Sequence, residues 1–199
     1  VVAAALFIVV FGIALGSRIR TIEGVPYEQF IVPGLVLMGV ATSAFANTAT
    51  SIYQARSDGF IEDPVSSPMT ASQLVLGYLT GGVLRSLLIG AATLAAARVF
   101  VSFPLERPGL LAAALVLTSL AFAALGIVVG LYSTGWDQQN FVGNLVIQPL
   151  VFLGGVFYSI DDLSRPWREM THADPIFYMV TAARHGILGS GDVGPWLAL

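Results

Sequence analysis

The chain has 199 residues, of which 56% are hydrophobic and only 11% are charged, and its formal net charge is −3. Soluble domains carry about 25% charged residues, so this composition argues against a soluble globular protein. The absence of cysteine excludes disulfides and thiolate metal sites, and the nine cations are all arginine, which excludes a phosphate-binding loop that depends on lysine.

Long apolar segments dominate the sequence. A bilayer core about 30 Å thick requires about 20 apolar helical residues, and only helices or closed barrels satisfy their backbone polar groups in lipid. The predicted fold class is therefore all-α, a polytopic transmembrane helical domain. Five spans are expected, at Val1–Gly16, Phe30–Tyr53, Leu74–Val101, Leu110–Tyr132 and Phe141–Tyr158.

The two ends of the sequence look cut. Val1–Gly16 starts without methionine or a charged flank, and Pro195–Leu199 resembles the opening of a sixth span. We therefore expect residues 1–199 to be one transmembrane domain, present here as a fragment with truncated first and sixth spans.

The second and third predicted spans contain unusual polar features. Ala41–Ser51 is rich in small and hydroxylated residues, which pack against other helices or line a wet path because lipid penalises polar groups. Arg85 lies inside the third span, which would be about 42 Å long as a helix and must tilt or protrude. Arg85 either faces a cavity or a partner, or extends to the membrane surface; the sequence leaves both open.

The fifth predicted span and the segment after it depart from a simple membrane helix. Pro149 is expected to kink the fifth span. Pro175–Leu188 is too short to cross a bilayer and is interrupted by Arg184 and His185, so a re-entrant external segment is predicted.

Three Gly-x-x-x-Gly pairs lie within the spans. Such pairs allow helix backbones to approach closely. We interpret them as packing within the chain, with a dimer contact as the alternative. The pairs are Gly12/Gly16, Gly77/Gly81 and Gly126/Gly130.

The ionisable residues do not form a recognisable catalytic or metal site. His172 and His185 lack the spacing of a helical metal pair. Glu62 and Asp63 fit a solvated loop better than a catalytic pair. Asp161 and Asp162 are expected to cap the following short helix rather than bind metal. The chain is therefore predicted not to be an enzyme.

Three stretches carry a resemblance to a known family. They are YEQFIVPG at Tyr27–Gly34, the loop from Asp58 to Thr70 followed by GYLTGGVLR at Gly77–Arg85, and FLGGVFY at Phe152–Tyr158 followed by Trp167, DPIFY at Asp174–Tyr178 and RHGILG at Arg184–Gly189. In this order and spacing the sequence resembles the membrane subunit of ATP-binding-cassette exporters of the type-2 permease family. The resemblance covers nearly the whole chain.

The resemblance implies a loop that docks on a separate ATPase subunit, within Gln54–Ser72 on the cytoplasmic side. Pro64 departs from the family, which usually has an apolar helical residue there, so the coupling helix is expected to start at this proline or to be shortened. The expected contact residues are Ser57, Asp58, Gly59, Phe60, Ile61, Glu62, Asp63, Pro64, Ser67 and Pro68.

The resemblance also implies a permease that moves a substrate outward across the bacterial inner membrane, as a multi-pass protein in contact with lipid. Two copies would enclose the path, the external segment Asp161–Gly191 would cap its exit, and no nucleic acid would be involved. ATP and magnesium would be bound by the partner subunit, since this chain has no nucleotide-binding motif or cofactor site of its own. Candidate residues along the substrate path are Arg85, Asn47, Phe152, Phe157 and Tyr158.

Arginine placement predicts the opposite orientation. Arg18, Arg20, Arg107, Arg165 and Arg168 fall on loops of one side, whereas Arg56 lies in the loops of the other. The positive-inside rule would make the arginine-rich side cytoplasmic. We adopt the topology that the resemblance implies, because terminal flanks usually carry much of the charge signal.

A secondary transporter or channel is the alternative function. Proton-coupled carriers usually place Asp or Glu inside the membrane. Apart from Arg85 and Arg98, the full spans contain no charged residue, which makes this alternative weaker. The substrate itself cannot be read from the sequence.

Overall fold

The structure, a computed structural model, describes residues 6–7, 10, 21–22, 24–159 and 164–189. Most of the predicted first span, the opening of a sixth span and the predicted caps Asp161 and Asp162 lie outside the described residues. In chain order the elements are β1 (Thr21–Ile22), β2 (Val25–Pro26), α2 (Tyr27–Ser57), α3 (Glu62–Ser66), α4 (Ala71–Phe100), α5 (Pro108–Tyr132), α6 (Trp136–Phe141), the π-helix η2 (Val142–Ile147), α7 (Gln148–Leu153), α8 (Arg165–Ala173) and α9 (Pro175–Leu188).

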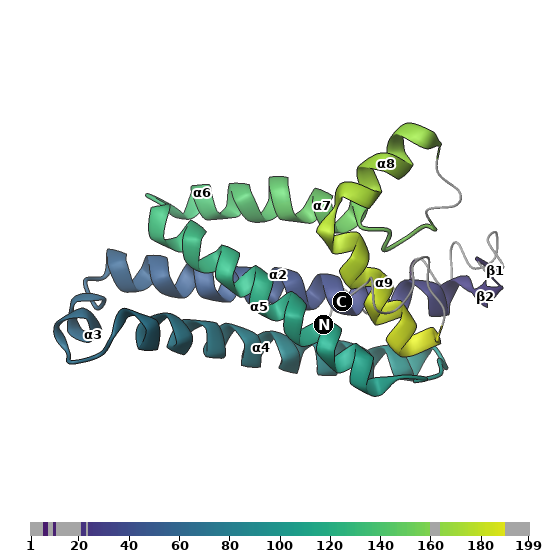
Figure 1. Cartoon of the computed structure of the whole chain (residues 1–199), viewed down its shortest axis with the longest axis horizontal. Coiled ribbons are helices and arrows are strands. Elements are labelled where there is room, and N and C mark those ends of the chain that lie inside the picture. The colour runs from purple at the N-terminus through teal and green to yellow at the C-terminus, as the bar shows by residue number, and fades with distance from the viewer. Residues whose placement is uncertain (1–5, 8–9, 11–20, 23, 160–163, 190–199) are drawn as a thin grey trace.

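The long helices form an elongated bundle with α2 at its centre. Both α4 and α5 contact α2, while α6, η2 and α7 run along another side of it (Figure 1). The short helix α3 lies at one end of the bundle, which we call the α3 end. The antiparallel pair β1–β2 and the helices α8 and α9 lie toward the opposite end, which we call the α9 end.

Three helices are long and apolar enough to cross a membrane: α2 with 31 residues, α4 with 30 and α5 with 25. At 1.5 Å per residue they are about 46, 45 and 38 Å long, which exceeds the bilayer core. This confirms the all-α class and the second, third and fourth predicted spans. It does not establish the total of five spans plus a re-entrant segment.

The predicted fifth span has different bounds and a different helix type from those expected. The helical stretch begins at Trp136 and ends at Leu153, instead of running from Phe141 to Tyr158. Its centre, η2, is π-helical and lies just before Pro149, which has no N–H to donate to the preceding turn. Gly155, with φ of +78°, follows the end of the helix in a backbone conformation that favours glycine.

Close backbone contact joins α5 to α2. An added Cβ at Gly126 would lie 2.5 Å from the Phe45 carbonyl oxygen, and one at Gly130 would lie 2.6 Å from that of Ala49. Packing within the chain is thus confirmed for this glycine pair. At Gly77 and Gly81 no described atom lies within 4 Å, so the same interpretation is wrong for that pair within the described part of the chain.

Helix α9 packs tightly at the α9 end. Its 14 residues span about 21 Å, and it contacts α2, α5 and α7. The Asp174 side chain caps its start by accepting a hydrogen bond from the Ile176 N–H at 2.9 Å. No donor among the described residues reaches the other carboxylate oxygen, and burial raises the pKa of Asp174 above its usual value.

The sequence had suggested that Arg184 interrupts the segment that forms α9. The structure shows that it does not. It is 1% exposed and lies inside the continuous helix. Its guanidinium donates to the Gly155 carbonyl at 2.8 Å and stacks 3.9 Å from the centre of the Phe30 ring. A cation–π contact and a hydrogen bond offset part of the cost of burying this charge, so Arg184 links α9 to α2 and to the loop after α7.

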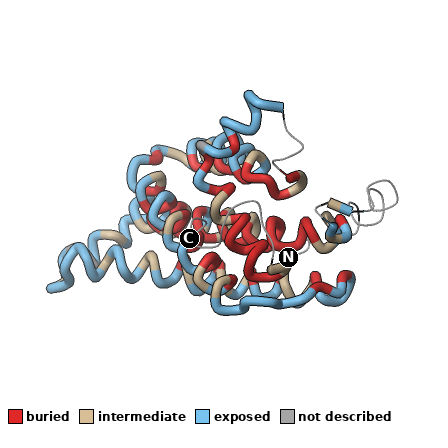
Figure 2. The backbone as a smooth tube through the Cα atoms, turned by 45° about the vertical axis from the view of Figure 1, so that its right-hand side comes forward, coloured by how far each residue is buried: buried red, intermediate tan, exposed pale blue. Residues whose placement is uncertain are grey.

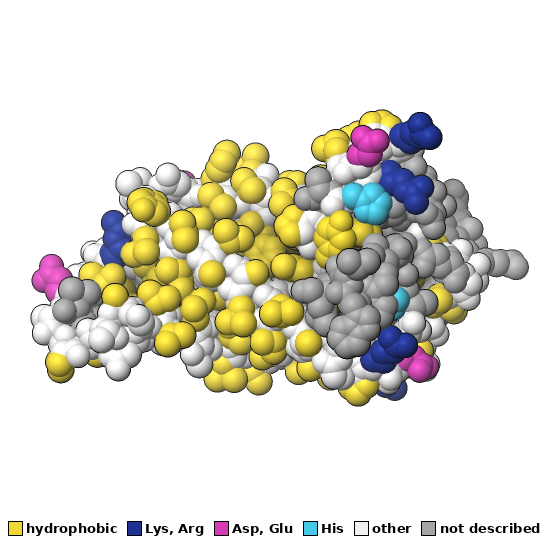
Figure 3. All heavy atoms as spheres, viewed as in Figure 1, with side chains coloured by type: hydrophobic (Ala, Val, Ile, Leu, Met, Phe, Trp, Pro, Cys, Tyr) yellow, Lys and Arg dark blue, Asp and Glu magenta, His cyan; other side chains and the backbone are white. Residues whose placement is uncertain are grey.

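Burial is uneven across the bundle. Buried residues concentrate in α2 and α9, whereas α4 is largely exposed (Figure 2). On the face shown in Figure 3, hydrophobic side chains cover the middle and charged side chains lie toward the two ends. Leu84 and Leu88 of α4, Leu125 of α5 and Leu145 of η2 are among the exposed large hydrophobic side chains. The surface is that of a membrane protein, with apolar side chains where lipid would lie.

Candidate functional site

A polar groove runs between α2 and the α6–η2–α7 stretch. Its polar compartment has a volume of about 150 Å³. One wall includes residues one turn apart on α2, and the facing wall includes amide side chains with the same spacing. The α2 wall presents Thr42, Ala46 and Thr50, and the facing wall presents Asn140, Asn144 and Gln148.

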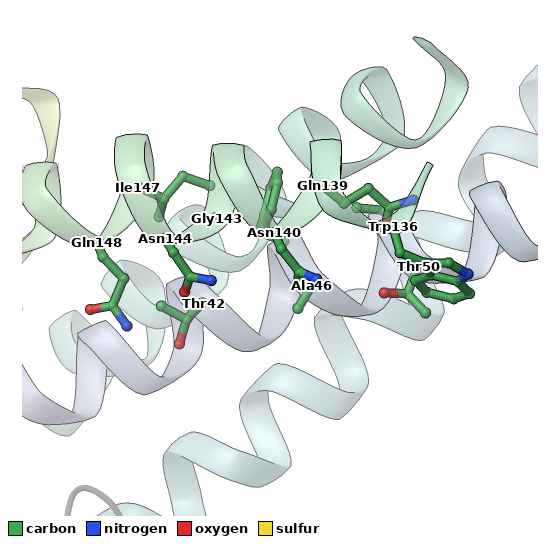
Figure 4. Close-up of a pocket in the computed structure, with 12 residues that line it drawn as sticks. Thr42, Ala46, Thr50, Trp136, Gln139, Asn140, Gly143, Asn144, Ile147 and Gln148 are labelled. Carbon is green, nitrogen blue, oxygen red and sulfur yellow. The ribbon is translucent and has the colours of Figure 1, made fainter. Parts of the chain in front are cut away.

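The two walls face each other in register. In Figure 4, Asn144 lies beside Thr42, Asn140 beside Ala46, and Trp136 beside Thr50. Within the described part of the chain, no hydrogen bond from the three wall amides to another residue is present, whereas Thr42 donates to the Met38 carbonyl at 2.7 Å. The amides are therefore available to a ligand, to water or to another chain.

A second compartment adjoins the first and is more apolar. Its volume is about 400 Å³, and it shares Thr42, Ala46 and Gln148 with the polar compartment. Its other lining residues are Phe7, Leu35, Met38, Gly39, Ser43, Ile89 and Thr93. Since α2 runs from the α9 end to the α3 end, the apolar compartment lies nearer the α9 end and the polar one nearer the α3 end.

Aromatic contacts lie at both ends of the groove. Toward the α3 end, Tyr53 and Trp136 make an edge-to-face contact with ring centres 5.0 Å apart. Toward the α9 end, the Phe157 ring lies 5.6 Å from Phe152 and 5.9 Å from Phe7. Edge-to-face and offset ring pairs at these separations are favourable, and they bring together segments far apart in sequence.

The structure brings some predicted path residues together but not all of them. Arg85 donates a 2.8 Å hydrogen bond to the Asn47 side chain, so two of the candidates form a pair between α4 and α2. Phe152 and Phe157 form another pair, and the Tyr158 hydroxyl donates to the Leu153 carbonyl at 2.7 Å. None of the five predicted path residues lines either compartment.

Sequence reasoning missed the amide wall. Asn140, Asn144 and Gln148 recur every four residues within a stretch that was considered only for its lack of charge. This spacing places polar groups on one helix face and could have identified them.

Comparison with known proteins decides the family. A family model described as "ABC-2 type transporter" matches residues 1–188. The chain belongs to the ABC-2 type transporter family. It is similar to the Escherichia coli K12 protein named "Inner membrane transport permease YadH", with 38% identity over 193 residues, which are 97% of this chain and 75% of the relative.

More distant relatives carry another name. The chain is 27% identical over 180 residues to "Nodulation protein J" of Sinorhizobium fredii, which covers 89% of this chain and 68% of the relative. The protein of the same name in Rhizobium meliloti is 27% identical over 186 residues, which are 90% of this chain and 69% of the relative. No solved structure matches.

The loop of this ABC-2 chain that was predicted to contact an ATPase lies at the α3 end. Its helix α3 begins at Glu62, two positions before Pro64, and is five residues long, so the helix does not start at the proline. Gly59, with φ of +78°, lies in the turn before it. The Phe60 side chain is 67% exposed.

Both flanks of this loop are firmly held. Arg56, in the last turn of α2, donates to the carbonyls of Gly130 and Leu131 at the C-terminal end of α5. A cation at this position satisfies carbonyls that lack helical partners. After the loop, Thr70 and Gln73 form a reciprocal capping box at the start of α4. The loop therefore connects directly to three of the long helices.

Among the described residues there is no group of three or more His, Asp or Glu side chains that could hold a metal ion. Glu62 and Asp63 are exposed in the first turn of α3. Their position agrees with a solvated loop and gives no support to a catalytic pair.

Proposed function

We propose that this ABC-2 chain is the permease subunit of an exporter and that the groove along α2 lines half of the transport path. The observation that carries the proposal is the amide wall, Asn140, Asn144 and Gln148, open beside the membrane-spanning helix α2. The name of the Escherichia coli relative, a transport permease of the inner membrane, supports the same function and location.

A second copy of the permease covers the groove in this proposal. Amide side chains facing lipid are unfavourable, since hydrocarbon offers them no hydrogen-bond partner. Two grooves facing each other across a two-fold axis would enclose a path lined by polar side chains. Such closed, symmetric pairs are the commonest form of soluble oligomer, and the same geometry suits a path between two permeases.

ATP hydrolysis by a separate subunit would drive the cycle through the α3 end, which the proposal places in the cytoplasm. The ATPase would contact α3 and the exposed Phe60. Because the loop is continuous with α2 and α4, and Arg56 ties it to α5, displacement of the loop would shift these helices against the α6–η2–α7 wall. Movement of one groove wall relative to the other would open the path outward.

Single cysteines provide a direct test, because the chain has no cysteine of its own. Cysteines introduced by Ser57→Cys and Ser66→Cys should not react with an impermeant thiol reagent in intact cells. They should react after permeabilisation and cross-link to the coexpressed ATPase subunit. Labelling in intact cells would show that the proposed topology is inverted. Labelling only after permeabilisation, without any cross-link to the ATPase subunit, would contradict the coupling role.

The alternative, a carrier or channel independent of ATP, is separable in vesicles. Among the described residues that line the groove there is no acidic side chain, so the described lining offers proton coupling no group to act through. Transport that persists without ATP but stops when the proton gradient is dissipated would favour the alternative.

A further inference from the structure

Arg85 is a cation within a membrane helix that has no acidic side chain at its level. It lies about 21 Å along the helix axis from Ala71, where α4 begins. The twelve acidic residues of the sequence all fall outside residues 1–22, 29–57, 64–105, 107–136 and 138–160, which include the long helices apart from the first turn of α2. A second identical copy would supply no acid there either. The counter-charge of Arg85 therefore has to come from outside these 199 residues.

The Arg85 side chain uses little of its hydrogen-bonding capacity. It is exposed, and its guanidinium donates to the Asn47 side-chain oxygen at 2.8 Å, which is its one hydrogen bond among the described residues. A guanidinium has five N–H donors, and the Asn47 amide has two more. The bond holds the guanidinium beside α2 and leaves a set of donors that suits the oxygens of a phosphate group.

Between Arg85 and the α3 end, this face of α4 is bare. Gly81 and Gly77 follow at one and two turns, and no described atom lies within 4 Å of a Cβ added at either position. Side chains on a helix lean toward its N-terminus, so Arg85 extends toward this glycine strip. The strip leads to a hollow of about 280 Å³ lined by Met69, Gln73, Leu74, Gly77 and Tyr78. The strip and the hollow leave room for a lipid head group beside the guanidinium.

Toward the α9 end, the same face of α4 is apolar. Leu84 and Leu88 follow Gly81 at helical spacing and are 61% and 64% exposed. If α4 is centred on a bilayer core about 30 Å thick, the Arg85 backbone lies about 14 Å from the core edge near α3, and the side chain reaches back toward that edge. A cation with an apolar strip on the midplane side matches the polarity of a phospholipid from the leaflet at the α3 end.

We propose that Arg85, Asn47 and the strip from Gly77 to Gly81 bind one anionic phospholipid of this leaflet. The phosphate contacts the guanidinium and the Asn47 amide, the rest of the head group lies in the hollow, and the acyl chains run along the two leucines. Neither Arg85 nor Asn47 lines the groove, so this is a resident lipid that neutralises Arg85 and is not the transported molecule. An anionic lipid is preferred to a zwitterionic one because a cationic head group would be repelled by the guanidinium.

Native mass spectrometry of the permease, purified with the subunits that accompany it, counts bound lipids directly. Phospholipids with two eight-carbon chains and either a glycerol or a choline head group would be titrated in detergent, below their own micelle formation. The protein should bind one phosphatidylglycerol per permease chain, at least about tenfold more tightly than phosphatidylcholine. Equal affinity for the two lipids would overturn the proposal.

Inorganic phosphate separates a lipid site from a site for any free anion. At the same concentration as phosphatidylglycerol it should not displace the lipid, because it lacks the acyl chains that lie along α4. Displacement at equal concentration would show that the site binds a free anion, and would contradict the proposal.

A charge variant tests the role of the guanidinium. Arg85→Gln should lower the affinity for phosphatidylglycerol about tenfold, to the level of phosphatidylcholine. Arg98→Gln is the matched control, because Arg98 is on the same helix near its other end and lies over the Phe103 ring at 4.9 Å. Arg98→Gln should bind the lipid as the wild type does. Equal losses in the two variants would mean general charge attraction and no site at Arg85.

A space-filling variant tests the glycine strip while keeping the charge. Gly81→Leu occupies the strip without meeting a described atom and should also weaken lipid binding about tenfold. Thr80→Leu adds bulk at the adjacent exposed position, off the strip, and should leave binding unchanged. If Arg85→Gln instead separated permease copies on size exclusion while lipid binding stayed as in the wild type, Arg85 would contact the second copy and the lipid site would be wrong.

Discussion

Two sides of α2 use the same small and hydroxylated residue types but differ in packing. The side that faces α5 is closely packed, whereas the side that faces the groove is open. Toward α5, the Thr48 hydroxyl donates to the Ala123 carbonyl at 2.9 Å, and Gly126 admits the α2 backbone. Toward the groove, Thr42 bonds only within its own helix, and the opposing wall carries amides. The partner helix, more than α2 itself, therefore decides which face is closed and which is open.

This difference has a mechanical meaning. Helices in lipid gain no hydrophobic drive to associate, so backbone contact and interhelical hydrogen bonds hold them together. The α2–α5 contact has both and is expected to move as a unit. The α2–η2 side has an open polar groove and is expected to be where relative motion occurs. Substitutions on the two sides of α2 test this contrast.

Gly126→Ala should disrupt the closed face most. The added methyl group would overlap the Thr48 hydroxyl and approach the Phe45 carbonyl, and overpacking of this kind costs about 1–3 kcal/mol. Thermal unfolding in detergent, followed by helical circular dichroism, should show a lower midpoint. Gly77→Ala is the control, since nothing described lies within 4 Å of an added methyl group there. Equal destabilisation by both variants would refute the close contact.

Thr48→Val should weaken the closed face without changing its shape. It removes the hydrogen bond to Ala123 and is expected to lower the free energy of unfolding by about 1 kcal/mol. Thr42→Val on the groove face removes a bond within α2 only, and should change stability by less than about 0.5 kcal/mol. The same unfolding assay compares the two. A larger loss from Thr42→Val would reverse the roles assigned to the two faces.

Arg85→Leu should leave stability and assembly nearly unchanged but lower ATP hydrolysis coupled to transport. Arg85 is exposed within the chain and donates a hydrogen bond to Asn47, so its loss removes a link between α4 and α2. Reconstituted ATP hydrolysis and size-exclusion profiles are the measurements. In a double-mutant cycle, Asn47→Leu should add little to Arg85→Leu. If ATP hydrolysis in the variant stayed normally coupled to transport, Arg85 would only extend to the membrane surface. If the variant failed to assemble, Arg85 would be a structural partner of another residue.

The smallest effect concerns Asp174, the residue that caps the start of α9, a helix that packs on α2 and α5. Its pKa is raised by burial, so the folded protein binds this proton more tightly than the unfolded chain does. The resulting stability is fully present below the usual Asp pKa of about 4 and is lost as pH rises through the higher folded value.

Asp174→Asn keeps a capping oxygen and removes the titration. It should therefore flatten the dependence of the unfolding midpoint on pH above about 4 and slightly raise the midpoint at neutral pH. Asp174→Ala, which removes the cap, should instead lower stability by about 1 kcal/mol. A pH profile of Asp174→Asn identical to that of the wild type would show that this carboxyl is not the responsible group.

Part of the candidate site followed from sequence alone. The polarity of Ala41–Ser51 predicted that this part of α2 packs on helices or borders a wet path, and the structure shows packing on α5 along one face and a polar groove along another. Arg85 and Asn47 were both selected, but their pairing was not foreseen. The amide wall was missed because a count of charged residues does not register amides.

The fifth helical stretch shows why some bounds could not be predicted. Its residues are apolar enough for a span, but Pro149 removes a backbone donor and η2 adopts wider turns before it. Gly154 then lies against Ile176 of α9, where an added Cβ would be 2.8 Å away. The end of this helix thus depends on a contact with a segment more than twenty residues later.

The sequence by itself determined the family, the all-α class and the positions of three long membrane helices. These follow from order, length and apolar composition, which are properties of a continuous segment. Only the tertiary structure decided which glycine pair packs on α2, how Arg184 is buried and which amides face the groove. Those outcomes depend on which helix faces oppose each other, and local sequence does not contain the rotation and register of one helix against another.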